Sequence, residues 1–242
     1  MKVLILAALK QEIKYVLKEL GARESVRGTY LARQGKVEIV IALTGMGVEN
    51  ARVRTRAVLL EQKPSIAVSI GFAGALYEKA DYGEIVCPSK AILYPGSDTI
   101  ELTGKFFGDC LSAVSEKAKI RQGAIVTLSN WIEKPELKGF LPPGLPYPVC
   151  DMETFPIANA VLKYGAVFFA IRAITDKAGD EIGIPPMQMA DANGQISVPL
   201  AVWRLVSNPR LIPNALKFRG SSEKAARTLA LGVKELIHYL SL

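Results

Sequence analysis

No apolar run in this sequence approaches the roughly 20 residues that a membrane-spanning helix needs. The early apolar stretch at residues 3–8 is short, and the charged residues Lys10 and Glu12 follow it closely. This stretch therefore predicts a buried strand rather than a signal peptide or a membrane anchor.

Cysteine and histidine are scarce. The three cysteines are widely spaced and lack the spacing of metal ligands, and the one histidine, His238, lies in an amphipathic pattern at the C-terminus. Without secretory features, this usage predicts reduced thiols and a cytoplasmic location. We expect no metal, no cofactor and no histidine-activated nucleophile.

A continuous basic tract is also missing, although the formal net charge is +7. Lysines and arginines are scattered through residues 10–63 and 105–138, and no platform of alternating aromatic and basic residues is present. Basic surfaces attract phosphates, nucleic acids and acidic lipids, but this scatter favours a solvated surface. We expect no nucleic-acid partner.

The composition is that of a protein with a large core. With 242 residues and 50% hydrophobic content, the chain fits one large or two small domains, and we favour one. Apolar runs alternate with helical patterns, which predicts an α/β fold with a largely parallel sheet. The expected strands are 3–8, 37–44, 65–70, 84–87, 123–128 and 166–171, and the expected helices 10–20, 49–62 and 153–164.

Two carboxylates flank the last of these helices and strands. Thr154 as a capping residue and Gly165 as a terminator predict helix 153–164, which places Glu153 at its entrance. An acidic residue at a helix N-terminus is also favourable without any function.

The strand at 166–171 is continuously apolar, and it is expected to end where Arg172 and Asp176 follow. Ligands of open α/β sheets bind at such carboxyl ends, so Asp176 is a candidate ligand-binding residue. An ordinary helix cap is an equally simple role for this aspartate.

Glycines follow the second buried strand at Gly45 and Gly47, where a helix begins. This context superficially fits a dinucleotide fingerprint. The turn after the first strand has no glycine, however, which argues against that fold unit. The pair equally suits close approach of a ligand or tight packing of strand on helix.

Six short motifs occur in the order and approximate spacing of one superfamily. The sequence resembles the nucleoside phosphorylases and nucleosidases, and within them the methylthioadenosine/S-adenosylhomocysteine nucleosidases. This resemblance implies a single-domain, three-layer α/β/α fold over residues 1–242 with a mixed, largely parallel sheet. It also implies a homodimer or higher oligomer. The motifs are residues 8–12, 44–47, 71–74, 83–86, 152–153 and 172–176.

The resemblance assigns roles to the polar residues. Asp176 would protonate the purine or hold a proton at its N7, and Glu12 would orient or deprotonate the attacking water. Glu153 would accept hydrogen bonds from the ribose hydroxyls, with Met152 packed beneath the sugar. A solvent-facing glutamate at position 12 and a core methionine at position 152 are the alternatives.

The base and the rest of the pocket follow in the same way. By resemblance, Trp131 would stack on the purine and Ile132 would bind its edge through the backbone. Tryptophan stacks well on bases, but it packs equally well beside a core. The remaining pocket positions implied by the family are Gly45, Gly47, Gly71, Phe72 and Ala73.

The residues that would bind phosphate differ from those of the related phosphorylases. Residues 7–9 replace their early phosphate loop, and Ser69 replaces an arginine. Arginine matches phosphate geometry, so its loss favours water as the acceptor. Phe72, in place of a small serine of the family, also makes phosphate binding less favourable. A phosphate-dependent phosphorylase and a non-catalytic nucleotide or membrane-surface binding module remain the alternatives.

The C-terminal part, residues 184–242, is expected to be a helical elaboration. Its segments 184–189, 198–206 and 209–219 are apolar and flanked by basic residues. They resemble the hopanoid-associated branch of the superfamily, whose members remove adenine from an adenosyl group on a polycyclic lipid. The substrate would then be an adenosylhopane-like nucleoside, with small thioadenosines as an equal alternative.

Four basic residues in this part could face anionic lipid, so a membrane surface is a further candidate partner. Packing in the core or in a dimer explains the same residues. They are Arg204, Arg210, Lys217 and Arg219.

Overall fold

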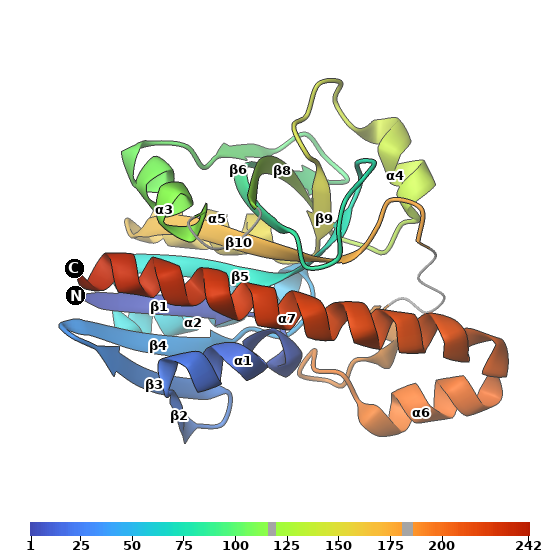
Figure 1. The fold of residues 1–242 in the computed structure, drawn as a ribbon, viewed down its shortest axis with the longest axis horizontal. Helices are drawn as coiled ribbons and strands as arrows, with labels where there is room; N and C mark the ends of the chain where they lie inside the picture. The colour runs from blue at the N-terminus through green and yellow to red at the C-terminus, as the bar shows by residue number, and fades with distance from the viewer. Residues whose placement is uncertain (116–119, 181–185) are drawn as a thin grey trace.

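The structure is a computed structural model, and it describes residues 1–115, 120–180 and 186–242. Ten strands form one mixed sheet in the order β10-β6-β8-β9-β5-β1-β4-β3-β2, with β7 paired to β6 (Figure 1). The strands are β1 (Lys2–Ala7), β2 (Arg23–Val26), β3 (Thr29–Gln34), β4 (Val37–Leu43), β5 (Ile66–Ala75), β6 (Ile85–Tyr94), β7 (Thr99–Glu101), β8 (Ile120–Leu128), β9 (Val149–Asp151) and β10 (Val167–Asp176).

Helices cover both faces of the sheet. On one face, α1 (Lys10–Leu20), α3 (Lys105–Ser115) and the second half of α7 (Ile212–Ser241) pack against alternate strand residues such as Ile5. On the other face, α2 (Val48–Gln62) and α5 (Thr154–Tyr164) pack against residues such as Leu6. β1 is buried on both faces because its side chains alternate between them. The predicted three-layer α/β/α fold is confirmed.

Part of the sheet closes on itself. β10 pairs with β5 on one side and with β6 on the other, and β8 and β9 complete the ring. The longest pairings, β5 with β10 and β6 with β8, are parallel, whereas β9 pairs parallel with β8 and antiparallel with β5, and β3 pairs antiparallel with β2 and β4. The carboxyl ends of β1, β5 and β10 consequently lie together.

Two local predictions need correction. The N-cap of α5 is Glu153 rather than Thr154, which is the first residue of the helix. The carboxylate of Asp151 accepts the backbone N–H of Thr154 at 2.9 Å. The strand expected at 166–171 continues to Asp176, with Arg172 buried inside it. An ion pair with Asp151 makes this burial tolerable.

Beyond residue 185 the chain is helical. Figure 1 shows α6 (Val198–Ser207) beside the first half of α7, both projecting past the end of the sheet. A short 3-10 turn, η1 (Pro186–Met189), precedes α6, and a second, η2 (Pro209–Leu211), joins α6 to α7. Residues 181–185, which include part of the apolar segment expected at 184–189, lie outside the described residues. No helix in the described ranges is long and apolar enough to cross a bilayer.

Candidate functional site

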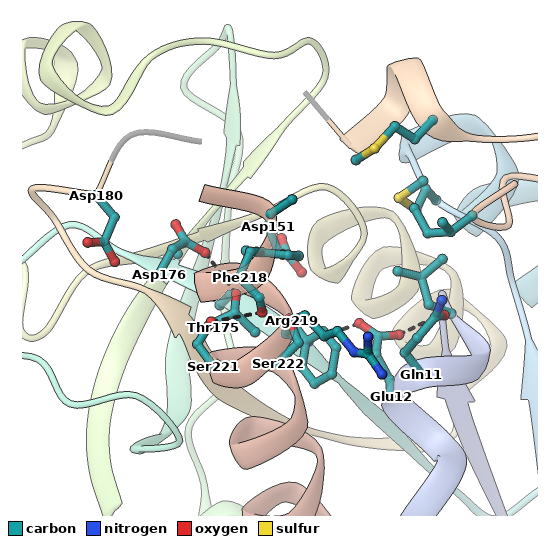
Figure 2. A pocket seen from close by; sticks show the side chains of 18 of the residues that line it. Gln11, Glu12, Asp151, Thr175, Asp176, Asp180, Phe218, Arg219, Ser221 and Ser222 are labelled. Atoms are coloured by element: carbon teal, nitrogen blue, oxygen red, sulfur yellow. Dashed lines mark hydrogen bonds between the residues drawn. The ribbon is translucent and has the colours of Figure 1, made fainter. Parts of the chain in front are cut away.

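A cavity of about 900 Å³ opens at the carboxyl ends of β1, β5 and β10, and α6 and α7 enclose its other end. Figure 2 shows Glu12, Asp151 and Asp176 around it, opposite the first half of α7. Most of the residues expected to form the site line this one cavity. They are Glu12, Phe72, Ala73, Trp131, Ile132, Met152, Glu153 and Asp176.

Glu12 is held by backbone groups from two elements. Its carboxylate accepts the N–H of Leu9 at 2.8 Å and the N–H of Phe72 at 2.9 Å. Burial raises the pKa of Glu12, although these N–H groups and the charge of Arg172 lower it. A carboxylate with a raised pKa is suited to take a proton near neutral pH. The position contradicts a solvent-facing role, since Glu12 is 4% exposed.

The three glycines expected in the pocket do not line the cavity. They lie directly behind it and allow close contacts between the segments that form it. A Cβ on Gly71 would lie 2.8 Å from Oε1 of Glu12, so any side chain there would displace the carboxylate. Gly47, with a φ of 92°, donates its N–H to Oε1 of Glu153 at 2.7 Å. Gly45 abuts the carbonyl of Asn193, where its own Cβ would clash at 2.3 Å.

Glu153 is unusually basic for a carboxyl group. Burial, followed by the charges of Asp151 and Glu12, raises its pKa from 4.5 to about 8, against the opposing effect of the Gly47 N–H and of Arg172. Its second oxygen accepts none of the hydrogen bonds recorded among the described residues. The carboxyl group therefore has acceptor capacity for hydroxyl groups in the cavity.

A buried ion pair beneath the site was missed by the sequence analysis. Arg172 donates to Asp151 at 3.1 Å, to the carbonyl and hydroxyl of Ser69 at 3.0 and 2.8 Å, to the Thr154 hydroxyl at 2.7 Å and to the Ile171 carbonyl at 3.0 Å. These bonds use all five N–H groups of the guanidinium. A charged residue inside an apolar strand was the only available signal, and it was interpreted as the end of that strand.

Asp176 has a cationic partner that was also missed. Its Oδ2 forms an ion pair with Nζ of Lys134, the first residue of α4 (Lys134–Phe140), and its Oδ1 accepts the Thr175 hydroxyl at 2.8 Å. Both charged side chains line the cavity and are almost fully buried. The helix-cap role considered for Asp176 is not observed, because residue 176 ends β10 and the described chain continues as a turn.

Trp131 and Ile132 lie in the loop between β8 and α4. Both side chains are half-buried and reach the cavity, and Nε1 of Trp131 donates to Glu133 at 3.2 Å. The indole is therefore not enclosed in a core, and it is available for stacking within the cavity.

The far end of the cavity is apolar. Residues after position 185 provide eight apolar lining side chains there: Met189, Ile196, Val198, Ala201, Leu205, Leu211, Ala215 and Phe218. The carboxylates lie at the strand ends, so the cavity has a polar and an apolar part. A ligand with a polar head and an apolar extension would match this division.

The sequence profile of the phosphorylase superfamily matches residues 2–198. The chain belongs to this superfamily. It is 25% identical over 206 residues to a 5′-methylthioadenosine/S-adenosylhomocysteine nucleosidase of an Exiguobacterium species, covering 76% of this chain and 88% of that enzyme. The predicted family is confirmed, and an N-glycosyl hydrolase agrees with the names of such relatives.

Solved structures with the same fold include proteins named for different substrates. The 5′-methylthioadenosine/S-adenosylhomocysteine nucleosidase of Campylobacter jejuni has a TM-score of 0.73 at 19% identity, covering 98% of both chains. The futalosine hydrolase of Helicobacter pylori has a TM-score of 0.72 at 18% identity, covering 98% of this chain and 97% of that one. These nearly equal scores show that the fold is shared. They do not distinguish between substrates, which must be argued from the residues of the site.

Proposed function

We propose that this protein is a purine nucleosidase that hydrolyses the N-ribosidic bond of a 5′-substituted adenosine. The observation that carries the proposal is the convergence of Glu12, Glu153 and Asp176 on one cavity in a member of the phosphorylase superfamily. Each carboxylate comes from a different element, and each corresponds to one need of the reaction.

The leaving group is the first need. Breaking the bond between C1′ and N9 develops positive charge on the sugar and negative charge on the purine, as in glycoside hydrolysis. Asp176 is proposed to supply or hold a proton at N7, which makes the base a better leaving group. Trp131 would stack on the ring, and the backbone of Ile132 would bind its edge.

The sugar and the acceptor are the other two needs. We propose that Glu153 accepts the 2′- and 3′-hydroxyls and that Met152 packs beneath the ribose. Glu12 would take a proton from the attacking water, for which its raised pKa is suitable. The backbone bonds of Glu12 to Leu9 and Phe72 would hold it in place during the reaction.

Water is favoured over phosphate because the nearest buried guanidinium has no free donor. Arg172 lies beside Ser69, where the related phosphorylases carry an arginine, but all five of its N–H groups are engaged. One observation favours the phosphorylase alternative: Arg219 of α7 also lines the cavity, and its guanidinium points toward Gln11 and Glu12 in Figure 2.

The apolar part of the cavity supports a large apolar 5′ substituent. Burial of apolar area contributes about 25 cal/mol per Å², so a lipid group enclosed by α6 and α7 would add substantial affinity. An adenosylhopane-like substrate fits this part, and a methylthio group would fill only a fraction of it.

The outer face of α6 supports contact with a membrane surface. Val202, Trp203 and Val206 are each more than half exposed there. Residues 192–222 contain four basic and no acidic residues, which suits an anionic lipid surface. A second copy of the chain could cover the same face, so we propose a homo-oligomer as well. A cytoplasmic location and a single domain over residues 1–242 complete the proposal.

One assay tests the function and its alternatives. The protein is incubated with methylthioadenosine, adenosylhomocysteine and a 5′-lipidated adenosine, each with and without phosphate, and free adenine and the sugar product are measured. Hydrolysis predicts adenine and a free ribose derivative in all phosphate-free reactions with an accepted substrate. A sugar 1-phosphate formed only with phosphate would establish the phosphorylase. No adenine from any substrate would favour the binding module.

A further inference from the structure

The Lys134 ammonium is buried at the base end of the cavity. Its side chain is 9% exposed, it forms an ion pair with Asp176, and it donates to the carbonyl of Lys177 at 2.6 Å. Removing an ammonium group from water costs several kcal/mol unless it is paired. The bonds to Asp176 and to the Lys177 carbonyl, just after β10, offset the cost of burying this ammonium group.

The backbone of β5 is shaped to fit the pair. A Cβ on Gly74 would lie 2.6 Å from Oδ2 of Asp176 and 3.0 Å from Cε of Lys134. The first contact is closer than real Cβ atoms come, and the second is tight, so a side chain at position 74 would displace Asp176 and press on Lys134.

Few other ionisable groups act on the pair. Cys150 of β9 lies near both side chains, but burial raises the pKa of its thiol to about 12, so it stays neutral. Asp180, beyond the end of β10, accepts the Tyr82 hydroxyl at 2.8 Å and Lys217 at 2.6 Å. Lys134 is consequently the cation that the described structure brings into contact with Asp176.

An aspartate paired with an ammonium group is ionised and has no proton of its own to give. An ion pair consists of a carboxylate and an ammonium group, so the proton of this pair is on the lysine nitrogen. A leaving-group acid built only from Asp176 would therefore be in the wrong protonation state. The Lys134 ammonium beside Asp176 carries a proton that could reach the purine through Asp176.

We infer that Lys134 is the proton source behind Asp176, an inference that rests on the proposed function. As the C1′–N9 bond breaks, its electron pair moves onto the purine. Asp176 takes a proton from the Lys134 ammonium, which becomes a neutral amine, and passes that proton to N7. The attacking water bonds to C1′ and gives its proton to Glu12. Transfer of that proton through solvent from Glu12 to Lys134 restores both groups. Lys134 acts through Asp176 and is thus a positioning residue.

The test is the pH dependence of kcat/KM for adenine release by the full-length chain and its Lys134→Met variant. General acids contribute about 100- to 10,000-fold, so we expect a loss of at least about 100-fold at pH 8. We expect a smaller loss at pH 5, because a carboxyl group without a cation can carry the proton itself only in acid. Lys134→Arg keeps the cation but cannot give up a proton inside a protein, so it is expected to lose the alkaline activity as Lys134→Met does.

Lys138→Met is the matched control. Lys138 lies one turn further along α4 and forms an ion pair with the exposed Glu78 outside the cavity, so its removal should leave kcat/KM within about twofold. Circular dichroism and a thermal melt verify that each variant is folded, and Lys134→Arg decides the question if Lys134→Met is not.

The outcomes separate the two proposals. An equal loss at every pH in Lys134→Met, or alkaline activity retained in Lys134→Arg, would mean that the lysine only holds Asp176 in place with its charge, and this would overturn the inference. A loss below about threefold at all pH values would overturn it too. A wild-type protein that releases no adenine from any substrate would instead refute the proposed function, and the role of Lys134 with it.

Discussion

Glu153→Gln should make the unliganded protein more stable at alkaline pH. The pKa of Glu153 is raised from 4.5 to about 8 in the folded state, so the folded protein binds a proton more tightly than the unfolded chain. Stability therefore falls as pH rises from about 4.5 to about 8, where the proton must leave a buried site. Glutamine keeps a similar shape and bears no charge at any pH.

The size of the effect follows from the same two values. At ~1.36 kcal/mol per pH unit, a pKa of about 8 in place of 4.5 bounds the full loss at about 5 kcal/mol, of which about 3.5 kcal/mol falls between pH 5 and pH 8. Glu153 is only half-buried, so solvent screens part of this. We expect about 2 kcal/mol, which is ~4–8 °C in Tm for a chain of this size.

The assay is a series of thermal melts from pH 5 to pH 8 on the wild type, Glu153→Gln and the control Glu61→Gln on the exposed face of α2. Because the charges of Glu12 and Glu153 act on each other, the difference between wild type and Glu153→Gln reports Glu153 together with its effect on Glu12. We expect the two Tm values to diverge with rising pH. Parallel curves, or a variant that loses stability as pH rises, would refute a protonated Glu153 in the unliganded site.

Three further changes test other parts of the site. Arg172→Met leaves Asp151 buried without its cation and should lower the free energy of unfolding by about 3–5 kcal/mol, measured by urea denaturation. Gly71→Ala places a Cβ 2.8 Å from Glu12 Oε1, so kcat should fall at least about tenfold, and an unchanged kcat would exclude Glu12 as the base. Ala201→Trp should raise KM for a 5′-lipidated adenosine much more than for methylthioadenosine; equal increases would place the substituent elsewhere.

The parts of the fold with strong periodicity were predictable from sequence. β1, β4 and β5 lie at continuous apolar runs, and α1 and α5 end at glycines in the left-handed conformation. The edge strand β2 and its neighbour β3 were not predicted, because their mostly exposed residues give only a weak alternation of apolar and polar side chains. The short β9 was missed as well, since three residues carry no periodic signal.

The sequence predicted the three carboxylates of the site but not the charged groups that pair with their neighbourhood. Glu12, Glu153 and Asp176 were identified through motif order, and they do line one cavity. The groups that set their charges were not identified, because the partners are distant in sequence: Lys134 is 42 positions from Asp176, and Arg172 is 21 from Asp151. Such pairs are created by strand order, which the local sequence does not encode.

The division of the cavity coincides with a division of the chain. The superfamily profile ends at residue 198, where α6 begins, and the three carboxylates all lie before that point. Of the eight apolar residues at the far end, six lie at position 198 or later. Bond cleavage depends on the shared α/β core, which must hold its charges rigidly. In the proposed function, recognition of the 5′ group would depend on α6 and α7, which lie outside the core and can change without disturbing those charges. A change of 5′ substituent within this superfamily should therefore require new residues in α6 and the first half of α7, and none at Glu12, Glu153 or Asp176.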